Sequence, residues 1–205
     1  MVGGMGVSGR LNVVMVGVGG QGLITAAKVL ADAAIDSGTK ALVAETHGLS
    51  QRGGAVEVHV RLGDVYAPLV PRGRADVLLA FELIEAARGV PYLRQGGVLI
   101  TSDVLLRPPI PGVVSPSRKD IEEAFRRAGI RYFVVPAREI AEKVGSYLSE
   151  NVVLLGALAS TGLLDRFVDI SRLKARIAEM PMADKNLMAF DEGYGTCSKL
   201  CRLGS

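Results

Sequence analysis

The sequence predicts a three-layer α/β fold with a mixed, mostly parallel sheet and additional helices at the C-terminal end. Three observations support it. Short apolar runs alternate with segments of helical periodicity up to Val144. Residues 55–62 alternate strictly between apolar and polar side chains, which is typical of an antiparallel strand. From Asn151 onward no convincing strand is present, so the last quarter is expected to be helical.

The chain begins with a strand, a helix and a second strand. Residues 11–16 form an apolar run that stops at Gly17, and residues 21–35 carry apolar side chains at helical spacing. Gly38 is expected to cap this helix. Residues 40–44 are predicted to be a buried strand, parallel to the first because a helix separates the two.

The alternating segment at residues 55–62 is predicted to be half exposed and antiparallel. His59 lies on its polar face and is expected at the surface or in an interface. A turn at residues 63–64 lets residues 65–69 return as a short hairpin arm before Pro71. An exposed strand of this kind can extend the sheet of another chain.

The middle of the chain continues the alternation. Strands are predicted at residues 75–80, 98–101 and 131–135, and helices at residues 82–88, 118–128 and 137–144. Ser117 is expected to cap the second of these helices, and Pro136 ends a strand and opens a helix. The prolines of residues 107–112 predict an extended loop.

Three helices are predicted in the last quarter: residues 151–161, a helix opened by Asp169 or Ser171, and residues 183–192. Residues 1–205 are assigned to one domain, with a core at 11–194, a helical part at 151–194 and a tail at 195–205. Cys197 and Cys201 lie in this tail. They are too few to hold an iron–sulfur cluster alone, so they are expected to be dispensable thiols.

Composition excludes several classes of function. A hydrophobic content of 49% and a charged content of 22% describe a folded chain with a largely covered sheet. The net charge of +3 is scattered and Trp is absent, which argues against nucleic-acid binding. No apolar stretch has the length of a membrane span, and the first ten residues lack signal-peptide features, so a cytoplasmic location is expected.

Residues 17–22, Gly-Val-Gly-Gly-Gln-Gly, follow the first predicted strand and open the first helix. In Rossmann-like folds this G-x-G-x-x-G spacing lets backbone N–H groups approach a phosphate at the positive end of a helix. Glu45 follows Gly22 by 23 residues, near the ribose-binding position of such folds. Tight packing of strand against helix explains the glycines equally well. The candidate ligand-binding residues are Gly17, Gly19, Gly20, Gln21 and Gly22.

A second, polar loop is predicted at residues 45–54, Glu-Thr-His-Gly-Leu-Ser-Gln-Arg-Gly-Gly. The carboxyl ends of parallel strands share one edge, so it is expected beside residues 17–22. His47 and Arg52 can donate to anionic groups, although for a lone histidine without a metal partner a role that only satisfies the backbone of its loop is favoured. The candidates here are His47, Ser50, Gln51, Arg52, Gly53 and Gly54.

Motifs for chemistry by this chain alone are missing from the sequence. Neither H-x-x-x-H nor C-x-x-C occurs, so no metal site is predicted. The serine-hydrolase elbow and the P-loop are also absent, and no residue is assigned a catalytic role.

The two glycine-rich motifs together resemble the gamma-type domain of 2-oxoacid:ferredoxin oxidoreductases. The resemblance spans about residues 11–194, and residues 185–194 look like the closing helix of that family. The H-G-x-S-Q-R-G-G form of the second loop favours the indolepyruvate type. The resemblance implies a subunit of an enzyme that decarboxylates a 2-oxoacid, here an arylpyruvate, passes two electrons to ferredoxin and releases an acyl-CoA.

The resemblance also implies that the cofactors lie on a partner. The chain has neither a GDG thiamine-diphosphate motif nor cluster-binding cysteine spacings. A larger alpha subunit is therefore expected to carry thiamine diphosphate and iron–sulfur clusters in a hetero-oligomer, with coenzyme A as co-substrate and no cofactor on this chain. Pyruvate, 2-oxoglutarate and branched-chain enzymes of the family are alternatives. A stand-alone dinucleotide-binding oxidoreductase and an assembly module are also left open.

Overall fold

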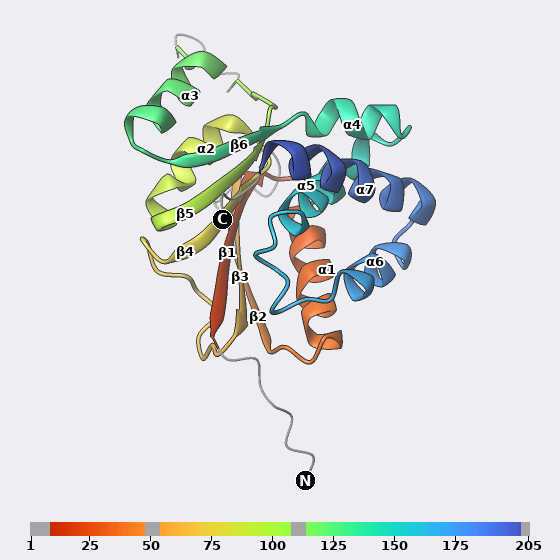
Figure 1. Cartoon of the computed structure of the whole chain (residues 1–205). Coiled ribbons are helices and arrows are strands. Elements are labelled where there is room, and N and C mark those ends of the chain that lie inside the picture. The colour runs from red at the N-terminus through yellow and green to blue at the C-terminus, as the bar shows by residue number, and fades with distance from the viewer. Residues whose placement is uncertain (1–8, 48–53, 108–113, 202–205) are drawn as a thin grey trace.

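The computed structural model describes residues 9–47, 54–107 and 114–201 (Figure 1). In these residues six strands form one sheet in the order β2-β3-β1-β4-β5-β6. The strands are β1 (Arg10–Val18), β2 (Ala41–His47), β3 (Ala55–Gly63), β4 (Ala75–Ala80), β5 (Leu93–Ser102) and β6 (Arg131–Val135). The helices are α1 (Leu23–Asp36), α2 (Leu83–Gly89), α3 (Arg118–Arg127), α4 (Ala137–Lys143), α5 (Glu150–Ala159), α6 (Ile170–Ala178) and α7 (Ala183–Leu200), with short 3-10 turns η1 (Val90–Tyr92) and η2 (Tyr147–Ser149).

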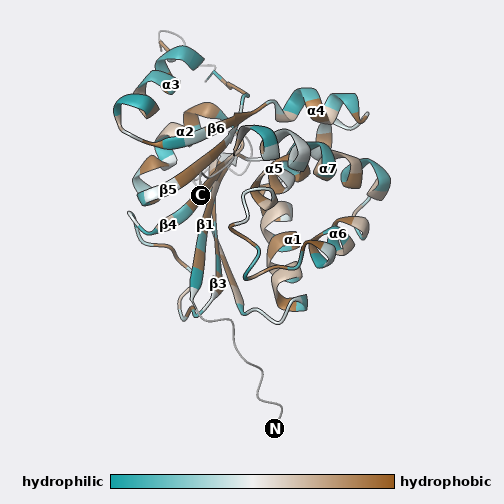
Figure 2. Ribbon diagram, viewed as in Figure 1, coloured by the Kyte–Doolittle hydropathy of each residue, from teal (hydrophilic) through white to brown (hydrophobic). Residues whose placement is uncertain are grey.

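The sheet is mixed and mostly parallel, as the sequence predicts. Strands β1, β2, β4, β5 and β6 run in one direction, and β3 is antiparallel to both of its neighbours. Figure 1 shows α1, α5, α6 and α7 on one side of the sheet and α2 and α3 on the other. Figure 2 shows apolar residues along the strands and polar residues on the outer side of α3. The three-layer α/β fold with C-terminal helices is therefore confirmed.

Strand β3 is not half exposed, and this expectation is wrong. It lies between β1 and β2, and His59 on its polar face is only 2% exposed. The backbone of the following segment covers that face, because the Val70 N–H donates to His59 Nδ1 at 3.1 Å and Arg61 donates to the Ala67 carbonyl oxygen at 2.6 Å. Residues 65–69 accordingly form no hairpin arm. Alternating polarity arises here from polar side chains that bind loop backbone, and β3 cannot extend another chain's sheet.

Strand β2 is longer than predicted, since Glu45, Thr46 and His47 belong to it and not to the loop. These residues pair with Val58, Glu57 and Val56 of β3. The end of β2 depends on its pairing with β3. The sequence alone does not show which strand lies beside β2. Residues 48–53 of the predicted loop lie outside the described residues.

Helix ends follow local sequence signals. Gly38 has φ 79° immediately after α1, and Ser117 forms a capping box with Asp120 at the start of α3. Asp169 caps α6 through the Ser171 N–H. At the start of α2 the side chain of Glu82, 1% exposed, accepts from the N–H groups of the helix's first turn.

Helix α7 continues to Leu200, through most of the predicted tail. Cys197 and Cys201 form a disulfide bond, and both are buried in the hydrophobic core. The expectation of dispensable thiols in a tail is wrong, and the spacing of the buried residues along α7 explains why. Ala189, Gly193 and Cys197 repeat every four residues and lie on the buried face of one helix. No helix in the described ranges has both the length and the hydropathy required to cross a bilayer.

Candidate functional site

The glycine turn, residues 17–22, joins the carboxyl end of β1 to α1. Gly20 and Gly22 have φ values of 103° and 78°, which side chains with a Cβ rarely adopt. Gly17 has another constraint, since a Cβ there would lie 2.9 Å from the Cβ of Phe81. The turn therefore requires glycine both for its backbone angles and for close packing against the end of β4.

Gln21 holds the glycine turn from beneath. Its Oε1 accepts a hydrogen bond from the Val18 N–H at 2.7 Å, and its Nε2 donates to the Phe81 carbonyl oxygen at 3.0 Å. The side chain thus links the carboxyl ends of β1 and β4. Gln21 was predicted as a ligand contact, and the structure gives its amide a positioning role.

The N-terminal end of α1 has neither a side-chain cap nor a negative charge in its first turn. Gly22 is the N-cap, no side chain caps the first turn, and no acidic residue lies in it. The free N–H groups and the helix dipole therefore favour an anion at this point. The Gly22 carbonyl oxygen accepts from the Ala26 N–H and, at 3.2 Å, from Asn151 Nδ2 of α5.

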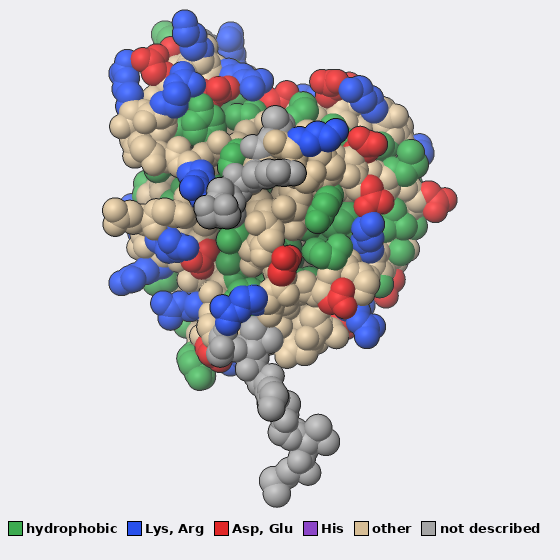
Figure 3. Space-filling view, viewed as in Figure 1, with side chains coloured by type: hydrophobic (Ala, Val, Ile, Leu, Met, Phe, Trp, Pro, Cys, Tyr) green, Lys and Arg blue, Asp and Glu red, His purple; other side chains and the backbone are tan. Residues whose placement is uncertain are grey.

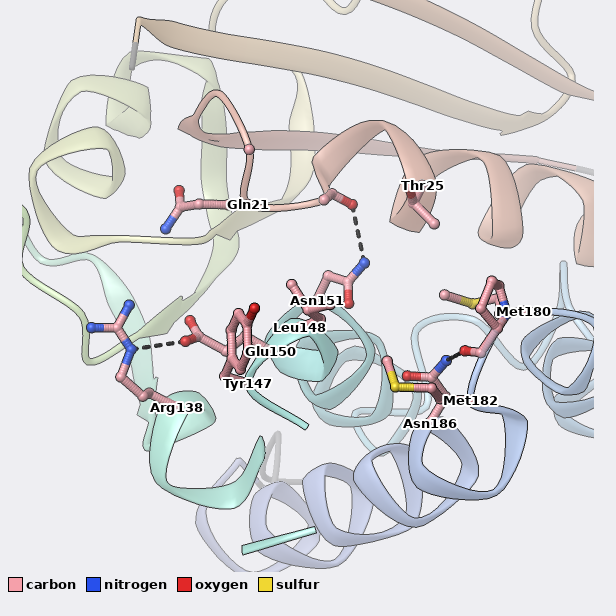
Figure 4. Close-up of a pocket in the computed structure, with 13 residues that line it drawn as sticks. Gln21, Thr25, Arg138, Tyr147, Leu148, Glu150, Asn151, Met180, Met182 and Asn186 are labelled. Atoms are coloured by element: carbon pink, nitrogen blue, oxygen red, sulfur yellow. Dashed lines mark hydrogen bonds and ion pairs between the residues drawn. The ribbon is translucent and has the colours of Figure 1, made fainter. Parts of the chain in front are cut away.

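A cavity of about 390 Å³ lies between the glycine turn and the C-terminal helices. Figure 4 shows Arg138, Tyr147 and Glu150 on one side, and Met180, Met182 and Asn186 on the other, with Asn151 reaching the glycine turn. The lining residues are Gly20, Gln21, Gly22, Thr25, Arg138, Tyr147, Leu148, Glu150, Asn151, Met180, Pro181, Met182 and Asn186. A smaller hollow of about 290 Å³ lies against Val18, Ile24 and Val56 beside the same turn.

One ion pair lies in the cavity wall. Arg138 Nε donates to Glu150 Oε1 at 2.8 Å, and this hydrogen bond raises the pKa of the Arg138 guanidinium. The pair fixes α4 against the start of α5. Because its charges neutralise each other, the cavity keeps only the partial positive charge of the α1 N-terminus.

Asn186 orders the opposite wall. It is 3% exposed, its Oδ1 accepts from Ser149 Oγ at 2.6 Å, and its Nδ2 donates to the Pro181 carbonyl oxygen at 2.9 Å. These bonds hold the segment before α7, where Met182 has φ 61° and is the one non-glycine residue of the described ranges with a positive φ. A left-handed backbone at a long side chain is strained, and such strain concentrates at functional sites.

The mouth of the cavity is apolar. Four large apolar side chains beside the glycine turn are exposed, and we call them the apolar rim: Tyr147, Leu148 and Met182, which line the cavity, and Ile24, which lines the adjoining hollow. Tyr147 is 71% exposed and Leu148 is 61% exposed. Neighbouring apolar side chains that remain in contact with water are typical of a protein–protein interface.

The two predicted motifs meet at one point. The Gly19 N–H donates to the Gly54 carbonyl oxygen at 3.0 Å, so the end of the second motif lies against the first. His47 is the last residue of β2, and Ser50, Gln51, Arg52 and Gly53 lie outside the described residues. Sequence reasoning missed Asn151 and Asn186. Asn151 had a signal, because it is a polar residue at the start of an almost entirely apolar helix.

The geometry differs from that of a dinucleotide-binding site. There the acidic ribose-binding residue lies at the end of the strand beside the glycine turn. Glu45 lies on β2, and β3 stands between β2 and β1, which separates the two strands by roughly 10 Å. The Gly19 N–H is also engaged by Gly54. Both features disfavour a nicotinamide or flavin nucleotide here.

Titratable groups with shifted pKa values lie largely away from the cavity. Burial lowers the pKa of His59 and raises the pKa values of Glu85 and Tyr92. The Tyr92 hydroxyl donates to Glu57 Oε2 at 2.8 Å, on the α2 side of the sheet. Within the described residues no three His, Cys, Asp or Glu side chains are grouped as metal ligands. The cavity lining offers backbone N–H groups, side-chain amides and apolar side chains for binding.

Comparisons with known proteins place the chain among oxidoreductase subunits. A family model described as "Pyruvate ferredoxin/flavodoxin oxidoreductase" matches residues 12–196. The chain is 41% identical to an indolepyruvate oxidoreductase subunit IorB of Archaeoglobus fulgidus, covering 90% of this chain and 94% of the relative. It is 39% identical to IorB of Pyrococcus horikoshii, over 94% and 98%. A 2-oxoglutarate synthase subunit KorC of Methanothermobacter thermautotrophicus is 30% identical, over 90% and 93%.

Solved structures share the fold. A keto/oxoacid ferredoxin oxidoreductase gamma subunit of Geobacter sulfurreducens matches with a TM-score of 0.67 at 24% identity, covering 91% of this chain and 98% of that one. A chain of 2-oxoglutarate:ferredoxin oxidoreductase from Magnetococcus marinus, with 2-oxoglutarate, coenzyme A and succinyl-CoA bound, matches with a TM-score of 0.69 at 23% identity. The match covers 93% of this chain and 31% of that one.

Proposed function

The chain belongs to the pyruvate ferredoxin/flavodoxin oxidoreductase family, and on this premise we propose that it is the smaller, beta subunit of an indolepyruvate:ferredoxin oxidoreductase. The complete enzyme converts an arylpyruvate and coenzyme A to an arylacetyl-CoA and carbon dioxide. The two electrons released pass to ferredoxin. The activity belongs to the complex, and this chain alone is expected to be inactive.

The observation that carries this proposal is similarity over almost the whole chain. The relatives named as indolepyruvate oxidoreductase subunits are 36–41% identical, whereas those named as 2-oxoglutarate synthase subunits are 27–30% identical. Each comparison covers at least nine-tenths of this chain. Indolepyruvate is therefore favoured over 2-oxoglutarate, and pyruvate and branched-chain 2-oxoacids are further alternatives within the family.

We assign thiamine diphosphate and the iron–sulfur clusters to a larger alpha subunit. The described part of this chain does not fit them, since it contains no grouped metal ligands and its two cysteines are joined in a disulfide bond. We therefore derive no chemical step through these groups from the residues of this chain. A cytoplasmic complex is part of the same proposal.

The alpha subunit is expected to cover the apolar rim. Ile24, Tyr147 and Met182 project there from three separate elements beside the glycine turn, and burial of such side chains favours association. The hydrogen bonds of Asn186 to Ser149 and to the Pro181 carbonyl oxygen hold the segment that carries Met182. Subunit contact would close the cavity from outside.

The glycine turn and the loop after β2 are proposed to face the active site of the complex at its coenzyme A end. The open N-terminus of α1 suits a phosphate group, and the cavity beside it is lined by neutral or paired side chains. The candidates are Gly17, Gly19, Gly20, Gln21, Gly22, His47, Ser50, Gln51, Arg52, Gly53 and Gly54. None is assigned a catalytic role.

Reconstitution tests the subunit assignment. The alpha subunit is expressed anaerobically with and without this chain, and ferredoxin reduction dependent on indolepyruvate and coenzyme A is measured. Activity is expected only when both chains are present. Full activity of the alpha subunit alone would contradict the proposal. The same preparation with pyruvate or 2-oxoglutarate as substrate decides among the alternatives.

A matched pair of variants tests the interface. Ile24 and Ile35 lie near opposite ends of α1 and both are exposed, but only Ile24 belongs to the apolar rim. Ile24→Glu is expected to weaken copurification with the alpha subunit at least tenfold, whereas Ile35→Glu leaves it unchanged. Equal copurification of the two variants would remove the rim from the interface.

A further inference from the structure

A row of cations follows the edge of the sheet opposite the glycine turn. Five strands run in one direction, and a Lys or Arg stands at or beside the first residue of each: Lys40 for β2, Arg10 for β1, Arg74 for β4, Arg94 for β5 and Arg131 for β6. Strand pairing places Lys40, Arg10 and Arg74 at the same level. Arg10 is opposite Gly63, whose N–H donates to the Lys40 carbonyl oxygen. Val13 is paired with Val77, which puts Arg10 level with Arg74.

More arginines join this row. Arg88 lies in the last turn of α2, and Arg126 and Arg127 lie in the last turn of α3. Helices that return to a parallel sheet end at the same edge where the strands begin. We call the full set the cationic edge: Arg10, Lys40, Arg72, Arg74, Arg88, Arg94, Arg126, Arg127 and Arg131. Figure 3 shows Lys and Arg gathered along the left and lower left of the molecule, where Figure 1 shows these strands beginning.

The acidic groups near this edge do not balance it. Glu85 is buried beneath Arg88, and Asp76 accepts from both Arg94 Nε at 2.6 Å and the Asn12 N–H at 2.8 Å. Glu122 and Glu123 pair with Arg126 and Arg127, and the exposed Asp64, which follows β3 at this edge, accepts from the Gly9 N–H. These five acidic residues are fewer than the nine cations. Arg10, Arg72, Arg74 and Arg131 form no ion pair with any residue in the described ranges. The edge therefore presents a net positive surface.

Helix stability accounts for only part of this set. Cations in the last turn of a helix stabilise its negative end, which explains Arg88, Arg126 and Arg127. It does not explain Arg10, Arg74 or Arg131, which precede or begin strands. Four unpaired arginines at one edge repel one another and favour binding of an anionic surface.

The chemistry of the edge favours a protein as its partner. Eight of the nine cations are arginines, whose planar guanidinium groups bind carboxylates in a bidentate manner. One aromatic ring at this edge is exposed, that of Tyr66 at 90%, and Lys40 Nζ lies 4.8 Å from its centre. A single ring covered by a cation is not the row of stacking rings that the bases of a nucleic acid use. Tyr66 and Leu69 are the exposed large apolar side chains of the segment between β3 and β4, whereas Tyr147, Leu148 and Met182 are grouped at the apolar rim, beside the opposite edge of the sheet.

We propose that the cationic edge guides a carboxylate-rich electron-carrier protein, the ferredoxin of the reaction, to the assembled enzyme. This inference rests on the proposed function. Electron-transfer complexes bury small areas and form quickly under charge attraction, and a polar arginine surface suits such an encounter. The edge carries no electron itself, since electrons leave from the clusters of the partner subunit. Its contribution is a higher rate of encounter.

The test uses the reconstituted enzyme with ferredoxin and, separately, with a small dye as acceptor. The double variant Arg74→Glu/Arg131→Glu changes two arginines without breaking an ion pair of the described residues. Its control is Arg172→Glu/Lys199→Glu, which changes the net charge equally on exposed positions of α6 and α7. The kcat/KM for ferredoxin is measured from about 20 mM to about 300 mM salt, where screening of exposed charges becomes strong.

The edge variant is expected to lower kcat/KM for ferredoxin by roughly tenfold at low salt, with the difference disappearing at high salt. Dye reduction and the control variant stay at the wild-type level. Unchanged ferredoxin kinetics would overturn the inference, as would an equal loss with the dye, which would indicate a defect in assembly or chemistry. Binding of a labelled RNA that the edge variant loses while ferredoxin kinetics stay normal would reassign the surface to nucleic acid. Absence of dye reduction by wild-type enzyme would instead contradict the proposed function.

Discussion

Gly156 of α5 and Gly193 of α7 each lie against the backbone of the other's helix. A Cβ on Gly156 would overlap the Phe190 carbonyl oxygen, and a Cβ on Gly193 would overlap the Val153 carbonyl oxygen. The two helices therefore cross at backbone contact, and neither position has room for any other residue. This crossing closes the core beneath the cavity that the two helices help to form.

Substitution at this crossing is expected to destabilise the fold. Gly193→Ala forces the two helices apart and is expected to lower the free energy of unfolding by about 1 to 3 kcal/mol. Gly195→Ala, two residues further along α7, is the control, because a Cβ there meets no atom within 4 Å. It is expected to raise stability by up to about 1 kcal/mol through helix propensity. Urea unfolding of the three proteins checks the prediction, and equal effects of the two changes would contradict it.

Met182 gives a prediction that separates stability from assembly. Met182→Gly relieves the left-handed backbone and is expected to raise the free energy of unfolding by up to about 1 kcal/mol. The same change removes a side chain of the apolar rim, so affinity for the alpha subunit is expected to fall. Thermal unfolding and a binding titration measure the two effects. Met188→Gly, in the interior of α7, serves as comparison and should lower stability.

His59 predicts a pH dependence of stability. Burial holds its folded pKa below the ordinary value of 6.5, so the unfolded chain binds the proton more readily. The contribution of His59 is therefore complete above about pH 6.5, and it is lost as the pH falls from there toward the folded pKa. His59→Asn keeps an acceptor for the Val70 N–H. As the pH falls from 7.5 to 5.5, the variant should gain stability relative to the wild type. A difference in free energy of unfolding that stays constant over this range would refute the assignment.

The disulfide bond between Cys197 and Cys201 predicts sensitivity to reductant. Opening its short loop is expected to lower the free energy of unfolding by about 2 kcal/mol on the loop-closure account. The Cys197→Ala/Cys201→Ala variant should match the reduced wild type and show no response to added thiol. Unfolding curves with and without reductant test this, and a variant as stable as the oxidised protein would show that the bond adds nothing.

Local patterns predicted elements well and their arrangement less well. The strand at residues 131–135 and the helix cap at Ser117 match the structure, because propensity and capping depend on neighbouring residues. The position of β3 between β1 and β2 was not predictable in this way, since strand order depends on contacts far apart in sequence. The prediction that His59 lies at the surface or in an interface was wrong for the same reason. An alternating strand is half exposed only when nothing covers its polar face.

Only the glycine-turn side of the candidate site was predictable from the sequence. The glycine turn carries a strong local signal, and the structure places it at the cavity. The rest of the cavity wall includes Asn151 and Asn186, more than a hundred residues later, which reach the cavity only after the C-terminal helices fold back. The segment that carries Cys197 was predicted to be a tail for a related reason. Only the packing of α7 shows that both cysteines are buried.

The close crossing of α5 and α7 also has a consequence for biosynthesis. During translation α5 leaves the ribosome before α7, so the groove around Gly156 and the apolar residues beside it stay uncovered until Gly193 has been made. The nascent chain then exposes both this groove and one wall of the unfinished cavity. A partner that arrived before that moment would meet an incomplete surface, so assembly of the complex is expected to follow synthesis of α7.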